Sequence, residues 1–139
     1  MPEITVLELA RYRLQKAGEM LESAKRDMTA EDYASANNRA YYCIFHSMRA
    51  VLALNGQDYK KHSAVISQFM LLYLKPELLP RKFSNLITNA SLIRNRSDYE
   101  DFYICSVSDT EALVAGAEEL LAEVRAYLQK EFEDKNEPF

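Results

Sequence analysis

Arg94, Asn95 and Tyr99 lie within the segment SLIRNRSDYEDFY and include residue types that can handle a phosphate group. The side chain of an arginine presents a planar fork of N–H donors that can bind two phosphate oxygens at once. The competing interpretation is structural, because a cation and an amide are both common near the carboxyl end of a helix. The segment is therefore either a phosphate-handling site or a solvated helix end.

Two histidines, His46 and His62, are further candidates for proton transfer, because imidazole has a pKa of about 6.5. A histidine on an apolar helix, such as His46, more often makes a hydrogen bond in a core or an interface. His62 stands next to a helix start, where it can be a capping or surface residue. The tyrosines nearby are expected mainly to pack with their polar tips at an interface. The polar residues that accompany the histidines are Arg39, Tyr41, Tyr42, Lys60 and Lys61.

Other kinds of site lack the residues that they need. Three glycines are too few to suggest a phosphate-binding loop, and no serine or cysteine nucleophile is paired with a nearby base. No run of histidines, cysteines and carboxylates has the spacing of metal ligands, so we predict neither a metal nor a cofactor. Cys43 and Cys105 have no CxxC spacing and are expected to be reduced thiols.

The net charge of −4 is unevenly distributed. Residues 59–96 carry seven basic side chains and one acidic one, whereas residues 97–139 carry three basic and twelve acidic ones. A locally basic segment in an acidic protein can gather phosphates. The alternative is that acidic and basic helices simply lie side by side. Nucleic-acid binding is permitted by this pattern but does not follow from it.

Hydrophobic periodicity predicts five helices, beginning with two long ones. Apolar residues recur at steps of three and four from Leu7 to Ala24, which predicts a first helix of about 22 residues. Thr29 and Asp32 resemble a capping box for the second helix, which continues to a stop at Gly56.

The other three helices are marked by their ends and by their apolar faces. The third covers residues 63–74 and ends before Pro76, and the fourth covers residues 81–96. The fifth opens at a capping box of Ser108 and Glu111. The fourth helix is expected to bury Phe83, Leu86, Ile87, Ala90 and Ile93, and the fifth Leu113, Ala117, Leu120, Leu121, Val124 and Leu128. Together the elements predict an all-α fold, an antiparallel up-and-down bundle of about five helices.

The length of 139 residues fits one domain. We predict a single helical domain over residues 1–130 and a flexible tail over residues 131–139. No apolar run approaches the roughly 20 residues that span a bilayer, and the amino terminus lacks the order of a signal peptide. The protein is therefore expected to be cytoplasmic, without membrane contact.

Three segments in the right order resemble the HEPN family, specifically its small stand-alone bacterial and archaeal members. They are NRAYYCIFHSMRAVLAL at 38–54, KKHSAVISQF at 60–69 and LIRNRSDYEDF at 92–102. The resemblance covers residues 5–130 and implies an all-helical bundle that pairs as a homodimer. It also implies an activity on RNA or nucleotide, either as a metal-independent endoribonuclease or as the toxin-like partner of a minimal nucleotidyltransferase.

The family motif pairs an arginine and a following polar residue with a histidine a few positions later. Arg94 and Asn95 match its first part, but the expected histidine position holds Tyr99. A tyrosine with a pKa of about 10 is a poor base for a ribose hydroxyl, so catalysis would need His46, His62 or a tyrosine with a lowered pKa. Enzymatic activity is therefore left open. The alternative is a noncatalytic module that binds RNA, nucleotide or a partner protein.

Overall fold

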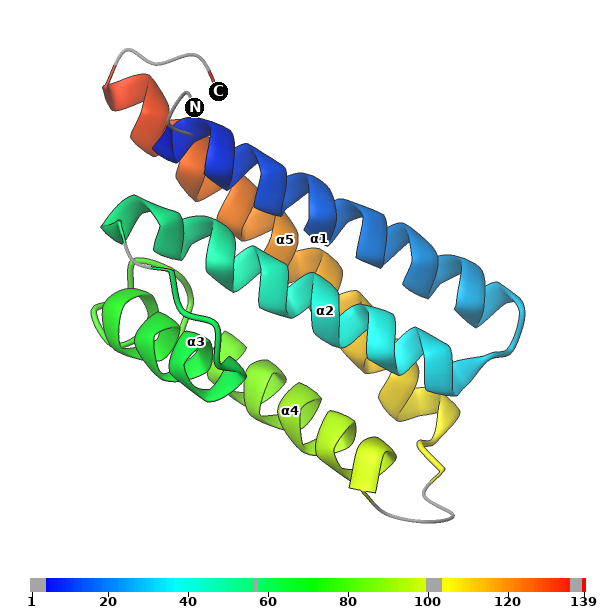
Figure 1. The fold of residues 1–139 in the computed structure, drawn as a ribbon. Coiled ribbons are helices and arrows are strands. Elements are labelled where there is room, and N and C mark those ends of the chain that lie inside the picture. Colours follow the sequence, from blue (N-terminus) through cyan, green and yellow to red (C-terminus); the bar gives the residue numbers. More distant parts are fainter. Residues whose placement is uncertain (1–4, 57, 100–103, 136–138) are drawn as a thin grey trace.

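The computed structural model describes residues 5–56, 58–99, 104–135 and 139, apart from the side chains of Asp98 and Tyr99. Over these residues the fold is all-α and contains no strand, which confirms the predicted class. Figure 1 shows successive long helices running in opposite directions, with α2 at the centre, where it contacts each of the other four. The α-helices are α1 (Val6–Thr29), α2 (Tyr33–Leu52), α3 (His62–Phe69), α4 (Phe83–Tyr99) and α5 (Val107–Asp134).

Two helix starts differ from the predicted capping boxes. The cap of α2 is Asp32, whose carboxylate accepts a hydrogen bond from the backbone N–H of Ser35, while Thr29 ends α1. The cap of α5 is Ser106, whose hydroxyl accepts from the backbone N–H of Asp109, so the prediction of Ser108 was wrong. Each cap satisfies one of the amide groups that a helix start leaves without an internal partner.

Short irregular turns close two of the helices. A 3-10 turn, η1 (Ala53–Asn55), follows α2 and ends at Gly56, whose left-handed φ of 68° agrees with the predicted stop. A π-helical turn, η2 (Met70–Leu74), continues α3 to the point where Pro76 was expected to end it. Tyr73 in this turn donates a hydrogen bond to the carbonyl oxygen of Val51, which ties η2 to the end of α2.

The core consists of the apolar faces that the periodicity predicts. All six residues expected on the inner face of α5 are buried, as are Phe83, Ile87 and Ala90 of α4. Leu86 and Ile93 are only partly buried at the edge of α4. Helix α5 also continues into the segment predicted as a tail, because it runs to Asp134 and buries the ring of Phe132.

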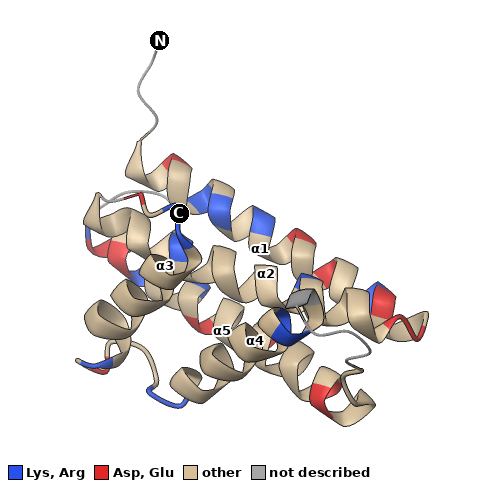
Figure 2. Cartoon of the chain, turned by 60° about the horizontal axis from the view of Figure 1, so that its bottom comes forward, with Lys and Arg blue, Asp and Glu red and all other residues tan. Residues whose placement is uncertain are grey.

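The acidic and basic segments do meet, as the structural interpretation of the charge pattern expected. Lys82, in the basic segment just before α4, forms an ion pair with Glu119 of α5. The neighbouring Glu118 pairs with Lys25 of α1, which lies outside that segment. Figure 2 shows basic residues along the first half of α1, where Arg11, Arg13 and Lys16 lie. No helix in the described part of the chain is long and apolar enough to cross a membrane.

Candidate functional site

Arg94 of α4 lies against Tyr41 of α2. The guanidinium carbon of Arg94 is 5.2 Å from the centroid of the Tyr41 ring, within the range of a cation–π contact. Burial raises the pKa of Tyr41, and the charge and hydrogen bonding of Arg94 only partly oppose this rise. The phenol therefore stays neutral at neutral pH and can take part in hydrogen bonds as a donor or an acceptor.

His62, the first residue of α3, joins the same cluster from a third helix. Its Nδ1 is 2.7 Å from the hydroxyl oxygen of Tyr41, and its ring stacks on Phe45 with centroids 4.2 Å apart. Burial lowers the pKa of His62, and the charges of Arg94 and Arg49 lower it further. The imidazole is consequently neutral at pH 7, as a general base must be.

The hydrogen bond to Tyr41 determines what the other nitrogen of His62 can do. When Nδ1 carries the hydrogen it donates to the Tyr41 oxygen, and Nε2 is left as a proton acceptor. When Tyr41 donates to Nδ1 instead, Nε2 carries the hydrogen and is a donor. Tyr41 can thus hold either neutral tautomer of His62, and only the tautomer with hydrogen on Nδ1 leaves Nε2 free to accept a proton.

His46, on α2 itself, packs against two aromatic rings that also meet His62. Its ring packs against Tyr42 and Phe45, with centroids 6.2 Å and 5.6 Å away. Burial lowers its pKa to about 4, and the next largest causes are the charges of Arg49 and Lys16. Tyr41 contacts both Arg94 and His62. The charges that act on His46 are instead mainly those of Arg49, Lys16 and Arg13, with a smaller effect of His62.

The remaining predicted site residues are less closely tied to this cluster. Asn95 is exposed on α4, and Tyr99 ends the same helix, but its side chain is outside the described residues. Lys60 and Lys61 are exposed in the segment before His62, and Arg39 is exposed on α2. These positions remain predictions.

Burial also determines the protonation state of one cysteine thiol. Cys43 is fully buried in α2, and burial raises the pKa of its thiol to about 12, so it stays protonated. Cys43 and Cys105 are both free. Among the described residues, no group of three or more histidines, cysteines and carboxylates could hold a metal ion.

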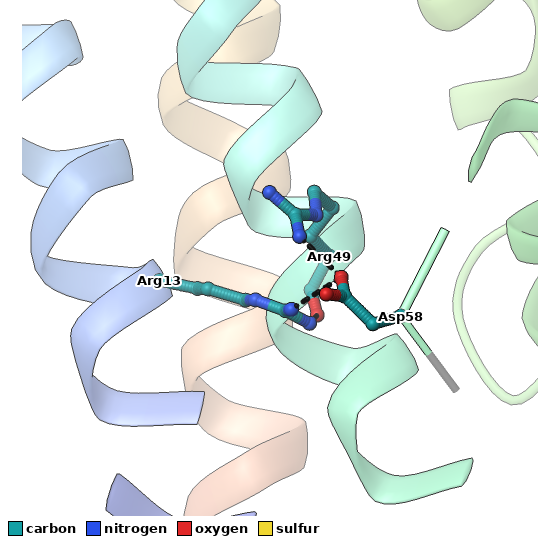
Figure 3. Close-up of polar contacts among 3 residues, drawn as sticks. All are labelled: Arg13, Arg49 and Asp58. Carbon is teal, nitrogen blue, oxygen red and sulfur yellow. Dashed lines mark hydrogen bonds and ion pairs between the residues drawn. The ribbon is translucent and has the colours of Figure 1, made fainter. Parts of the chain in front are cut away.

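A second polar cluster, which the sequence reasoning missed, is formed by Arg13, Arg49 and Asp58. Figure 3 shows both arginines converging on the carboxylate of Asp58, one from α1 and one from α2. Arg13 lies 2.9 Å and Arg49 2.5 Å from the same oxygen, Oδ1. The hydrogen bond from Arg49 lowers the pKa of Asp58, burial opposes it, and the charges of both arginines and the hydrogen bond from Arg13 add to the lowering. The signal in the sequence was Arg13, a cation beside Leu14 in the apolar stripe of α1.

Arg13 is almost completely buried, with 5% of its surface exposed. Besides its contact with Asp58, it donates a hydrogen bond of 2.8 Å to the carbonyl oxygen of Arg49. It therefore fixes the end of α2 and the segment after Gly56 to α1. That segment leads within a few residues to His62.

Comparison with known proteins identifies the family. A family model described as HEPN domain matches residues 10–127. The chain belongs to the HEPN family. All three residues of the Arg94, Tyr41 and His62 cluster lie within the matched part of this HEPN domain.

Among the relatives of this HEPN protein are two from Methanocaldococcus jannaschii. "Putative toxin MJ0605" is 34% identical over 86 residues, which cover 62% of this chain and 64% of that protein. "Putative toxin MJ0142" is 27% identical over 115 residues, or 83% of this chain and 78% of that protein. A "UPF0332 protein" of Thermotoga maritima is 28% identical over 92 residues, which cover 66% and 70% of the two chains.

Proposed function

We propose that this HEPN protein is a metal-independent endoribonuclease of a toxin-like kind, with Arg94 binding the phosphate and His62 moving the proton. Membership in the HEPN family and the two relatives named as toxins support an assignment of this class. The observation that carries it is the cluster in which Arg94 lies over the ring of Tyr41 and the hydroxyl of Tyr41 bonds to His62.

The side chains of the site can accept and return the protons that the proposed cleavage of RNA requires. Nε2 of His62 accepts the proton of a ribose 2′-hydroxyl, and the 2′-oxygen then forms a bond to phosphorus while the bond to the 5′-oxygen breaks. The leaving oxygen takes a proton, which protonated His62 or water can supply. Arg94 stabilises the charge that develops on the phosphate oxygens, an effect that typically contributes about 10²- to 10³-fold in rate for one donor.

The test is cleavage of single-stranded RNA in EDTA by the wild type, Arg94→Ala and His62→Gln. Both variants should lose activity and keep the wild-type circular dichroism spectrum. Arg96→Ala is the matched control, because it removes another cation of α4, two residues beyond Arg94. Brisk cleavage by either Arg94→Ala or His62→Gln would contradict the assignment.

A noncatalytic HEPN module is the second candidate, favoured by Tyr99 at the position where the family has histidine. In that case the wild type binds RNA or nucleotide without cutting it, and Tyr99→His restores cleavage that needs no metal. Arg94→Ala in the same background should remove the restored activity. Wild-type cleavage that depends on His62 would instead reject the noncatalytic candidate.

The proposed function includes two protein–protein interactions. We propose a homodimer, in which arginines from two subunits face one cleft, and a minimal nucleotidyltransferase as the physiological partner. Exposed apolar residues such as Leu92 of α4 and Val107 of α5 provide surface for pairing. Co-purification with a nucleotidyltransferase encoded in the neighbouring gene would test the partner.

A further inference from the structure

A row of aromatic and cationic side chains follows one face of α2. Tyr41, Phe45 and Arg49 are spaced by four residues and therefore lie one above another on successive turns. Arg94 stands over the ring of Tyr41 at one end of the row, and Arg49 stands 5.8 Å from the ring centroid of Phe45 at the other. The imidazole of His62 lies between the two cations, stacked on Phe45 and bonded to Tyr41.

The two ends of this row are far enough apart for different phosphates of one strand. Eight residues of α-helix rise about 12 Å, at about 1.5 Å per residue. A stacked nucleic-acid strand advances about 3.4 Å per nucleotide, so this distance corresponds to roughly three or four nucleotide steps. We therefore expect the cations at the two ends of the row to meet different phosphates.

Among the described residues, more cations than carboxylates surround Arg49. Arg13, Arg49 and Lys16 all lower the pKa of His46 by their charge, whereas Asp58 is the acidic partner in the described ion pairs of this cluster. The side chain of Asp58 is 56% exposed, while that of Arg13 is only 6% exposed. The carboxylate therefore lies on the solvent side of the pair, where another anion can compete with it.

We propose that Arg49 binds a second phosphate of the same RNA strand, so that the substrate is a single-stranded RNA of several nucleotides. Asp58 occupies this subsite in the free protein and competes with the RNA. The inference rests on the proposed function for the assignment of Arg94 to the scissile phosphate. It adds a binding residue, a minimum length for the substrate and an internal competitor.

Binding to a 2′-O-methyl RNA of twelve nucleotides tests the inference without any cleavage, because its 2′-oxygen has no proton to lose. Fluorescence anisotropy would measure affinity at several salt concentrations for the wild type, Arg49→Gln and Asp58→Asn. Arg49→Gln should weaken binding about tenfold and reduce the salt slope by about 0.7, the value for one phosphate contact on a single strand. Asp58→Asn should tighten binding even though it removes an ion pair.

Arg49→Gln and Asp58→Asn are expected to change RNA affinity in opposite directions. This difference distinguishes a role of the cluster in RNA binding from a role in stability alone. If the cluster only stabilises the fold, Asp58→Asn will bind no more tightly than the wild type, and this outcome would overturn the proposal. Lys25→Gln and Glu118→Gln change the net charge by the same amounts at a distant ion pair and serve as matched controls. Arg49→Lys, which keeps the charge, should retain most of the salt slope if Arg49→Gln proves too unstable to measure.

Substrate length provides an independent readout. In a protein that cleaves RNA, Arg49→Gln should lower kcat/KM more for a hexanucleotide than for a dinucleotide, whereas Arg94→Ala should lower both to a similar extent. A wild type that binds the twelve-nucleotide RNA but never cleaves unmodified RNA would refute the proposed endoribonuclease and leave the Arg49 subsite standing. Failure of the wild type to bind that RNA, or equal binding by Arg49→Gln, would refute the subsite.

Discussion

At the scale of single residues, the neutral state of His62 decides whether the site can take a proton from a ribose hydroxyl. Burial and the charges of Arg94 and Arg49 all disfavour the imidazolium, so the pKa of His62 lies below its usual value. A base with a lowered pKa stays active at lower pH. This property distinguishes an imidazole from an ordinary tyrosine side chain, whose pKa of about 10 keeps it protonated at neutral pH.

The rate of RNA cleavage should therefore become independent of pH already below pH 7. We expect kcat/KM to rise with pH through one inflection below about 6.5 and to be constant at neutral pH, because the free imidazole is already deprotonated there. Steady-state rates between pH 4.5 and 8 would measure this. His62→Gln should abolish the profile and His46→Gln should preserve it; the reverse result would transfer the proton-transfer role to His46.

His46 should affect stability rather than catalysis. Its pKa is about 4 in the folded protein and about 6.5 in the unfolded chain, so the unfolded state binds more protons in the interval between them. The free energy of unfolding should fall as the pH is lowered from about 6.5 to about 4. His46→Gln should flatten this dependence in urea titrations at pH 7 and pH 5. An unchanged difference between the two pH values would show that other groups cause it.

Arg94 should matter little to the fold despite its contact with Tyr41. A partly exposed cation–π contact contributes about 0.5–1 kcal/mol, which in a domain of this size corresponds to a shift in Tm of a few degrees. Loss of the phosphate contact should reduce RNA affinity about tenfold to a hundredfold. Differential scanning calorimetry and RNA titration of Arg94→Ala would separate the two effects, and equal RNA binding by mutant and wild type would count against a site at Arg94.

At the scale of helices, the apolar periodicity identified the elements, while their starts depended on local competition between capping groups. Ser106 and Ser108 are equivalent in composition, and each has an acidic residue three positions later. The described contacts place the hydroxyl of Ser106 on the amide of Asp109. Sequence alone does not rank the two, because the preceding segment decides which residue leaves helical geometry.

Replacing each serine by alanine should show which one caps α5. Ser106→Ala should lower the free energy of unfolding by about 0.5–2 kcal/mol, since an amide at the helix start loses its partner. Ser108→Ala should change it little and serves as the control, because Ser108 is exposed within the first turn. Chemical denaturation would measure both. A larger loss for Ser108→Ala would restore the cap predicted from the sequence.

At the scale of the whole molecule, the proposed homodimer needs an apolar surface that one chain leaves uncovered. Leu92 is 47% exposed on α4, and together with Leu86 and Ile93 it lines a pocket of about 290 Å³ between α4 and α5. We expect light scattering to give twice the chain mass of 16.0 kDa. Leu92→Asp should shift the mass towards one chain with the helical content preserved. A wild-type mass of one chain that persists on concentration would remove the shared-cleft model.

The fold was predictable from the sequence because helical periodicity is a local property, and Leu113, Ala117 and Leu120 mark the core by their spacing alone. The site was predictable only as a set of separate candidates. The sequence does not show which of the two histidines, His46 or His62, lies in the site. Only the packing of α3 against α2 brings His62 to Tyr41. The cluster of Arg13, Arg49 and Asp58 is assembled from three segments, and no local pattern connects its members.

The face-to-face packing of His62 on Phe45 also has a consequence for nuclear magnetic resonance. Protons held above an aromatic ring are shielded by its ring current, so the carbon-bound imidazole protons of His62 should resonate upfield of their usual positions. The ring of His46 meets Phe45 at 67°, compared with 23° for His62, and should be shifted differently. Because the chain has only two histidines, the two sets of signals can be followed without isotopic labelling or substitution. Their chemical shifts would report the protonation of each ring separately while RNA is added.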